Sequence, residues 1–162
     1  ALGMRVIGIS STVREMDGFD EVHSRHHALG PIAQADYLVL LTPYTPETHG
    51  IINERTFSVM KRSSYLINLA RGGVVHEGDL IKALNNKTIQ AAALDVFEQE
   101  PLPAEHVFWG MRNVIVTPHE GGFYDGYVQE AIPVIQTNLQ CFERGDFQQM
   151  INVVRVAHAT SS

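Results

Sequence analysis

Residues 65–73, with the sequence YLINLARGG, constrain the fold of this chain more than any other stretch. The first part is mostly apolar and shows no helical period, which predicts a buried strand of a parallel sheet. Two glycines follow and allow the backbone to turn tightly. Arg71 therefore stands at the carboxyl end of a buried strand, which is the edge where open α/β sheets bind their ligands.

The same arrangement occurs twice more, where apolar segments lead to Asp95 and to His119. Strand-like apolar segments alternate with helical ones, which predicts a doubly wound parallel α/β sheet with helices on its faces. We expect strands at 5–10, 35–42, 65–70, 89–96 and 113–116, and helices at 53–60, 77–85 and 127–144.

Several residues mark where these helices begin and end. Asn53 is the expected N-cap of the first helix, and Gly145 stops the last one. Pro133 either kinks that last helix or marks its true start. Residues 17–31 are polar and are predicted to form an irregular loop.

This polar stretch contains a cluster of histidines, His23, His26 and His27. Their spacing suggests a metal site, but no carboxylate or thiolate completes a recognisable ligand set. We therefore expect solvated histidines and no metal.

The length, composition and net charge of the chain argue against several classes of protein. The chain has 162 residues and 44% hydrophobic content, enough for one domain with a core, and its net charge of −6 argues against a nucleic-acid or anionic-membrane partner. Cys141 is the only cysteine, and no apolar run approaches the ~20 residues that span a membrane. The first ten residues do not resemble a signal peptide, so we expect a soluble, cytoplasmic protein.

The strand-end residues suggest acid–base chemistry on a carboxylate. Arg71 presents a planar, charged fork that can grip a carboxylate, although it can equally satisfy nearby carbonyls or a surface partner. His119 can act as a general acid near neutral pH or make only a structural hydrogen bond. Glu98 and Glu100 are either solvated or, for one of them, keep a histidine protonated. Asp95 ends an apolar run and needs a partner, or it serves as an N-cap or turn residue.

Taken together, these groups suit the reduction of a 2-keto acid, for which a cofactor must supply the hydride. The segments NLARGG, ALDVFEQEPLP and NVIVTPHEGG resemble, in order and spacing, the D-isomer-specific 2-hydroxyacid dehydrogenases over nearly the whole chain. The resemblance implies that Arg71 binds the substrate carboxylate and keto oxygen and that His119 donates the proton. It also implies that Glu100, not Glu98, supports this histidine.

The resemblance further implies a Rossmann-like fold that binds NADP or NAD, with Asp95 hydrogen-bonded to the nicotinamide carboxamide. Other residues expected at the cofactor are Thr42, Pro43, Thr48, Leu69, Ala70, Gly121 and Gly122, together with Arg71 and His119. Small 2-keto or 2-hydroxy acids such as glyoxylate or hydroxypyruvate are the implied substrates, and a homodimer is the implied assembly.

Two departures from the family pattern matter. No G-x-G-x-x-G spacing occurs among the 13 glycines, so we expect an incomplete sheet that lacks the first strand and its glycine-rich loop. We expect a partial cofactor domain at 1–124 and, at 125–162, a helix and tail that return to an absent substrate domain. Such a fragment is expected to be inactive alone.

The second departure concerns the first expected strand, which ends in Ser10 where NAD users carry an acidic residue. Small hydroxyls with Arg14 nearby favour the 2′-phosphate of NADP, and a merely permissive loop is the alternative.

A catalytically inactive nucleotide-sensing or protein-binding module of the same fold is the main competing function. An unrelated flavodoxin-type domain would leave the strand-end residues without a common purpose.

Overall fold

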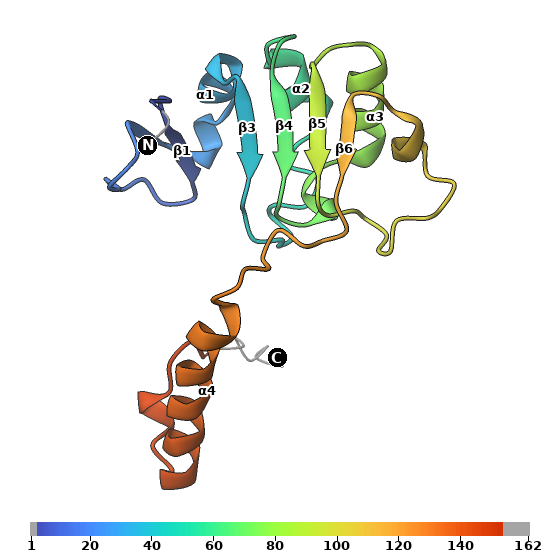
Figure 1. The fold of residues 1–162 in the computed structure, drawn as a ribbon. Helices are drawn as coiled ribbons and strands as arrows, with labels where there is room; N and C mark the ends of the chain where they lie inside the picture. The colour runs from blue at the N-terminus through green and yellow to red at the C-terminus, as the bar shows by residue number, and fades with distance from the viewer. Residues whose placement is uncertain (1–2, 154–162) are drawn as a thin grey trace, which may run out of the picture. The chain divides into compact units, whose positions relative to one another are not determined.

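The computed structural model describes residues 3–153 of the chain. The chain divides into two compact units, Ala1–Gly121 and Gly122–Ser162. The first unit contains all the strands, and the second contains one long helix (Figure 1). Among the described residues, no helix is both long and apolar enough to cross a membrane.

The first unit is built from parallel strands and short helices. Its strands are β1 (Ile7–Ser10), β2 (Glu21–Ser24), β3 (Tyr37–Leu40), β4 (Tyr65–Asn68), β5 (Ala91–Leu94) and β6 (Val114–Val116), and its α-helices are α1 (Leu29–Gln34), α2 (Glu54–Val59) and α3 (Glu77–Asn85). Short 3-10 helices η1 (Arg25–His27), η2 (Gly72–Val74) and η3 (Val107–Gly110) connect them. The second unit contains α4 (Tyr127–Arg144) and η4 (Phe147–Gln149).

Every paired strand of the first unit runs parallel to its neighbour. Strands β3, β4, β5 and β6 form one sheet in that order, and β1 pairs with β2 in a separate two-stranded sheet. The predicted parallel α/β fold is therefore confirmed. The β1–β2 pair and the four-stranded sheet share no strand pairing among the described residues, as expected for an incomplete sheet.

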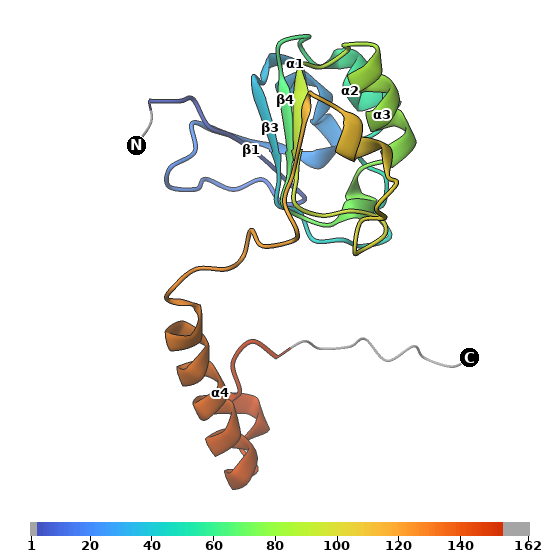
Figure 2. The same cartoon turned by 45° about the vertical axis from the view of Figure 1, so that its right-hand side comes forward.

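Alternation along the strands separates two faces of the four-stranded sheet. One face carries Leu38, Leu40, Leu66 and Leu94, all buried against the helices. Figure 2 shows α1, α2 and α3 on this side of the sheet. The helices contribute Phe57, Leu80 and Leu84 to the same core. Large apolar side chains on the opposite face are exposed, among them Tyr37, Val39, Tyr65, Leu69 and Ile115.

The predicted helix ends are confirmed by their capping contacts. The Asn53 side chain accepts a hydrogen bond from the Arg55 amide at the start of α2. Gly145 adopts a left-handed conformation, with φ of 74°, directly after α4. This conformation is open to glycine without a steric penalty, which explains why the helix stops there.

One local prediction was wrong, and one alternative left open for Pro133 is excluded. Residues 17–31 are not an irregular loop, because β2 and the start of α1 lie within them. The β2 sequence EVHS hides its strand among polar residues, and Pro31 is tolerated because it occupies the first turn of α1. Pro133 does not begin α4 but lies inside it, six residues after the first helical residue, Tyr127.

The core predicts a large difference between Leu66, which lies in β4, and Leu41, which directly follows β3. Leu66→Ala removes a fully buried side chain and should destabilise the first unit by about 2–5 kcal/mol. Leu41→Ala removes a side chain that is 72% exposed and should change stability by less than about 0.5 kcal/mol. Urea unfolding followed by the fluorescence of Trp109, the single tryptophan, measures both. Equal effects would contradict the assignment of the two faces.

Candidate active site

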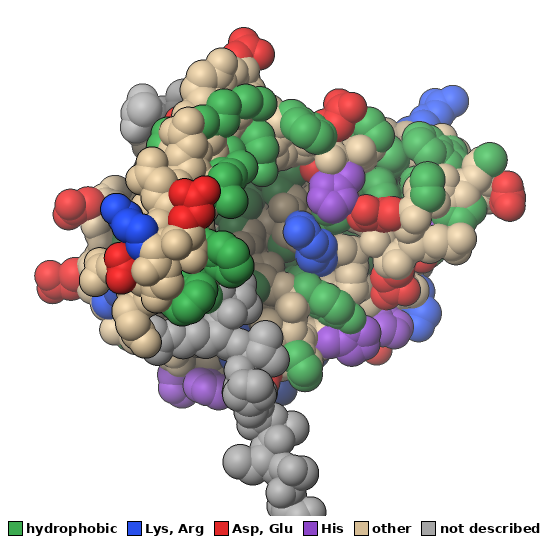
Figure 3. Space-filling model, turned by 90° about the horizontal axis from the view of Figure 1, so that it is seen from below, with side chains coloured by type: hydrophobic (Ala, Val, Ile, Leu, Met, Phe, Trp, Pro, Cys, Tyr) green, Lys and Arg blue, Asp and Glu red, His purple; other side chains and the backbone are tan. Residues whose placement is uncertain are grey.

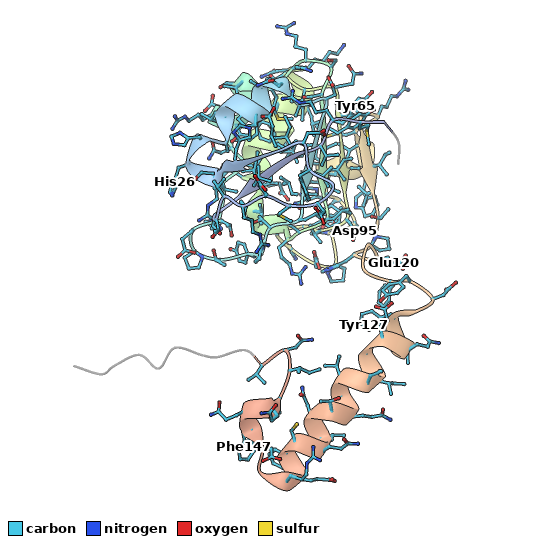
Figure 4. The ribbon with its side chains drawn as sticks, turned by 90° about the vertical axis from the view of Figure 1, so that its left-hand side faces the viewer. His26, Tyr65, Asp95, Glu120, Tyr127 and Phe147 are labelled. Carbon is cyan, nitrogen blue, oxygen red and sulfur yellow. The ribbon has the colours of Figure 1, made fainter. Side chains whose placement is uncertain are left out.

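The carboxyl ends of β4, β5 and β6 meet at one edge of the sheet because these strands are parallel neighbours. Arg71 follows β4, Asp95 follows β5 directly, and His119 follows β6. Figure 4 labels Asp95 and Glu120 at this edge. Figure 3 looks along the strands from their carboxyl ends, and basic, acidic and histidine side chains lie close together on the face it shows.

Glu100 and His119 form the central pair of this edge. Glu100 Oε2 lies 2.7 Å from Nδ1 of His119, and Oε1 accepts a hydrogen bond of 2.9 Å from the Phe97 amide. Both carboxylate oxygens are therefore engaged, and the pairing selects Glu100 over Glu98. Burial raises the pKa of Glu100, but the hydrogen bonds from His119 and Phe97 and the nearby charges outweigh it, so the pKa lies below its ordinary value of 4.5.

Asp95 organises the turn that carries His119. Its Oδ1 accepts hydrogen bonds from the Thr117 hydroxyl and the Glu120 amide, and its Oδ2 accepts one of 2.8 Å from the Gly121 amide. His119 adopts φ of 58°, which is uncommon for any residue other than glycine. Since Asp95 bonds to residues on both sides of His119, it holds this residue in the unusual conformation.

The pKa of Asp95 reflects the same contacts. Its side chain is almost fully buried, which raises the pKa, but the hydrogen bonds from Thr117, Gly121 and Glu120 lower it below the ordinary value of 3.8. The turn or capping role that the sequence left open for Asp95 is thus present in the structure. One lone pair of Oδ2 remains in principle for a further donor.

Arg71 leaves the sheet in a turn that is fixed by a buried asparagine. The Asn68 side chain accepts a hydrogen bond from the Ala70 amide and donates one to the Arg71 carbonyl. One nitrogen of the Arg71 guanidinium, Nη1, donates to the Ala70 carbonyl at 2.6 Å, and the other donors of the fork are not needed for that bond. The Arg71 charge also helps to lower the pKa of Glu100, so the two charged groups interact electrostatically.

Gly72 brings the Arg71 turn against the segment that leads to Glu100. A Cβ atom at Gly72 would lie 1.9 Å from the carbonyl carbon of Phe97 and 2.3 Å from the Glu98 amide nitrogen. No side chain fits there, so glycine is required for the two backbones to approach this closely. This contact fixes the spacing between the turn after β4 and the loop after β5.

The residues expected at a nicotinamide differ in how exposed they are. Leu69 is 43% exposed and lies next to Gly121, whereas the space beyond the Gly122 backbone is open. Ala70 and Thr48 are buried. The Thr48 hydroxyl donates to the Pro43 carbonyl at 2.7 Å and accepts from the Thr45 amide, so it shapes the loop after β3. Thr42 is partly buried, and Pro43 is exposed in the same loop.

The residues expected near a 2′-phosphate lie after β1. Ser10 ends this strand, its hydroxyl accepts a hydrogen bond from the Thr12 amide, and Arg14 is exposed in the following loop. The loop surrounds an open hollow of about 690 Å³ lined by residues 13–22. Two acidic residues of this lining are already engaged, Asp20 by the Val6 amide and Glu21 by Arg5 and His23.

Sequence reasoning missed three groups that build the site, namely Asn68, Thr117 and the Phe97 amide. Asn68 had a readable signal, because a polar residue at an inward position of an apolar strand needs a buried partner. Thr117 gave a weaker one, as a hydroxyl just after β6. The Phe97 amide gave none, since every residue but proline has such a donor.

The Asp95 contacts predict a loss of stability in Asp95→Asn. The amide of asparagine turns a donor toward backbone donors, which should cost about 1–3 kcal/mol in urea unfolding. Because the folded pKa is depressed, Asp95 stabilises the fold above about pH 3.8, and this contribution is lost as the pH falls through the folded pKa. The variant should lack that part of the pH dependence. Asp36→Asn, which removes only an exposed partner of Lys61, is the control and should behave like the parent chain.

Comparisons with known proteins place the chain in a family. Residues 1–121 match the family described as D-isomer specific 2-hydroxyacid dehydrogenase, NAD binding domain. The chain is 35% identical over 147 residues to glyoxylate/hydroxypyruvate reductase A of Yersinia enterocolitica, covering 90% of this chain and 46% of the relative. It is 37% identical over 145 residues to glyoxylate reductase of Thermococcus gammatolerans, covering 43% of that protein. The chain thus spans about half the length of these curated relatives.

Solved structures similar to this chain come from the same family. A D-isomer specific 2-hydroxyacid dehydrogenase from Xanthobacter autotrophicus, in complex with NADPH and MES, is 38% identical, with a TM-score of 0.80 over 88% of this chain and 58% of that one. The NADPH-dependent glyoxylate/hydroxypyruvate reductase of Sinorhizobium meliloti, in complex with NADP and sulfate, is 36% identical, with a TM-score of 0.79 over 88% of this chain and 46% of that one. The family and the Rossmann-like fold predicted from the strand-end motifs are therefore confirmed. The chain belongs to the D-isomer specific 2-hydroxyacid dehydrogenases, and its residues 1–121 match the NAD-binding domain of that family.

Proposed function

We propose that this chain forms the cofactor-side half of an oxidoreductase that transfers hydride between a nicotinamide cofactor and a small 2-keto or 2-hydroxy acid. The observation that carries the proposal is the Glu100–His119 pair, which lies within the electrostatic reach of Arg71 at one edge of the sheet. Relatives named as glyoxylate and hydroxypyruvate reductases support small 2-keto acids as substrates.

His119 is suited to protonate the keto oxygen of the substrate. Its Nδ1 is engaged by Glu100, so Nε2 is the ring nitrogen left to donate a proton. Glu100 is ionised at neutral pH, its pKa being lowered, and it can therefore form an ion pair with the His119 ring when that ring carries a proton to donate. The pair therefore presents a general acid when the reaction runs as a reduction.

Arg71 is suited to bind the carboxylate and to stabilise negative charge as it develops on the keto oxygen. Within residues 3–153, the hydrogen bond of the guanidinium is the one from Nη1 to the Ala70 carbonyl, which leaves the rest of the fork for a planar anion. The nicotinamide supplies the hydride when it is bound. Asp95, Leu69, Gly121 and Gly122 are the residues that would hold it, and Asp95 also keeps His119 in place.

Activity can be tested in a chimera in which this chain replaces the matching part of the Yersinia enterocolitica enzyme. We expect the chimera to oxidise NADPH with glyoxylate or hydroxypyruvate, and the chain alone to show no turnover. His119→Ala should lower kcat by about 100-fold or more, since general acid catalysis contributes that much. Undiminished turnover would remove His119 from the proton-donor role.

Glu100→Gln should mainly change the pH profile of the same chimera. Glutamine has no negative charge to pair with a protonated His119, so the dependence of reduction on pH should differ from that of the parent chimera. Glu105→Gln, which removes an exposed carboxylate of the same loop, serves as control and should leave the profile unchanged. An unaltered profile in Glu100→Gln would contradict the supporting role of Glu100.

We further propose NADP as the preferred cofactor, with Ser10 and Arg14 near its 2′-phosphate. The absence of an acidic residue at Ser10 and the existing partners of Asp20 and Glu21 support this preference. In the chimera, Arg14→Gln should weaken NADPH binding about tenfold and leave NADH binding nearly unchanged, as measured by cofactor fluorescence. Arg112→Gln, which alters an exposed arginine before β6, is the control. Equal affinities of the parent chimera for NADPH and NADH would refute the preference.

A homodimer in the cytoplasm is the assembly and location that we propose. One side of α4 carries the apolar residues Val128, Ile132, Ile135, Leu139 and Phe142, all exposed in this chain, and such a stripe favours association. A single buried cysteine, Cys141, is compatible with a reducing compartment.

A further inference from the structure

We propose that His106 and Glu77 form a positioning pair that holds the loop after β5 in place and thereby keeps Glu100 on His119. Neither residue belongs to the strand-end motifs. The importance of the pair for catalysis rests on the proposed function, whereas the positioning itself is a property of the described chain and can be measured without cofactor or substrate.

His106 is fixed at both ring nitrogens. Its Nδ1 accepts a hydrogen bond of 3.3 Å from the Phe108 amide, as the N-cap of η3, and its Nε2 lies 3.1 Å from Oε1 of Glu77. A backbone amide can only donate, so Nδ1 carries no proton. Nε2 therefore bears the hydrogen of a neutral ring and donates it to Glu77, and both side chains are mostly buried.

Glu77 anchors the pair in the rigid part of the fold. It is the first residue of α3, whose Leu80 and Leu84 lie in the core. His106 lies 29 residues further along the chain, in the loop between β5 and β6. The hydrogen bond thus ties this loop to a helix that packs on the sheet.

A continuous series of contacts leads from His106 to Glu100. The ring centroids of His106 and Phe108 are 4.7 Å apart, and those of Phe108 and Phe97 are 6.3 Å apart. Phe108 is 2% exposed and Phe97 is 7% exposed, so neither ring can move freely. The Phe97 amide is the donor that holds Oε1 of Glu100, whose Oε2 meets His119.

The packing around this series leaves little room for adjustment. Glu77, Phe97, Phe108 and Gly72 all line one small cavity of about 10 Å³, which is no larger than a water molecule needs. Gly72 also contacts the Phe97 backbone on the side of the Arg71 turn. Phe97 is therefore held between Gly72 and Phe108, and loss of the Phe108 support should release the Phe97 amide from Glu100.

The test is the titration of the Glu100 carboxyl group in the 162-residue chain labelled with carbon-13 at its glutamate carboxyls. Glu100 faces His119 and Arg71, and its lowered pKa depends on the hydrogen bonds from Phe97 and His119. In His106→Ala we expect this pKa to rise toward the ordinary value of 4.5, because the hydrogen bonds of Glu100 with Phe97 and His119 weaken.

Variants at Glu77 separate positioning from charge. Glu77→Ala removes the acceptor for His106 and should raise the Glu100 pKa, although loss of a negative charge by itself would lower it. Glu77→Gln removes the charge but keeps an oxygen that accepts from a neutral His106, so the Glu100 pKa should stay low. Glu77→Ala therefore gives opposite signs for the two explanations, and Glu77→Gln gives no change if positioning decides but a fall if charge decides.

Glu105→Gln, an exposed neighbour of His106, is the control for unspecific changes in the loop and should leave the Glu100 pKa unchanged. Thermal unfolding followed by circular dichroism establishes that each variant is folded. If His106→Ala does not fold, Glu77→Ala decides the question. An unchanged or lowered Glu100 pKa in folded Glu77→Ala overturns the proposal, and a rise in Glu77→Gln equal to that in Glu77→Ala does so as well. None of these results bears on hydride transfer, so failure here leaves the proposed function intact.

Discussion

Parallel pairing of β4, β5 and β6 is the constraint on which the site depends. The Asp95 amide donates to the Asn68 carbonyl, and the Thr117 amide donates to the Leu94 carbonyl, so the pairing continues to the carboxyl end of each strand. Arg71, Asp95 and His119 lie 24 residues or more apart in the chain, yet in-register parallel strands bring them to one edge. A shift of one residue between two of these strands would turn their end residues to the opposite face.

Buried polar side chains convert this edge into a site of defined geometry. Asn68 and Asp95 are almost completely buried at the ends of adjacent strands, where an unpaired polar group would be costly. Each is satisfied by the backbone of the turn that follows, Asn68 around Arg71 and Asp95 around His119. The hydrogen bonds that stabilise these two residues are thus the same ones that orient the functional side chains. Glu100 extends this arrangement, since it links the loop after β5 to His119.

The regular part of the fold could be predicted from the sequence because its signals are local. Apolar runs predicted β3, β4, β5 and β6, and Asn53 and Gly145 predicted the start of one helix and the end of another. The polar strand β2 was missed because its pairing with β1, not its composition, makes it a strand. The last helix was predicted at 127–144 despite Pro133, and α4 has these bounds, with the proline inside it.

The candidate site was predictable as a set of residues but not as a network. Motif spacing selected Arg71, Glu100 and His119 through a family resemblance. The Thr117 hydroxyl, the Phe97 amide and the His106–Glu77 contact depend on how loops distant in sequence pack together, which no local pattern records.

A crystal structure of the chimera with NADP and oxamate, a non-reactive analogue of a 2-keto acid, would test the roles of Arg71 and His119 together. We expect the carboxylate of oxamate to bind the Arg71 guanidinium and its carbonyl oxygen to lie about 2.6–3.2 Å from Nε2 of His119. We also expect Nδ1 of His119 to remain on Glu100. Oxamate bound away from Arg71, or a His119 ring whose Nε2 points away from the carbonyl oxygen, would contradict these roles.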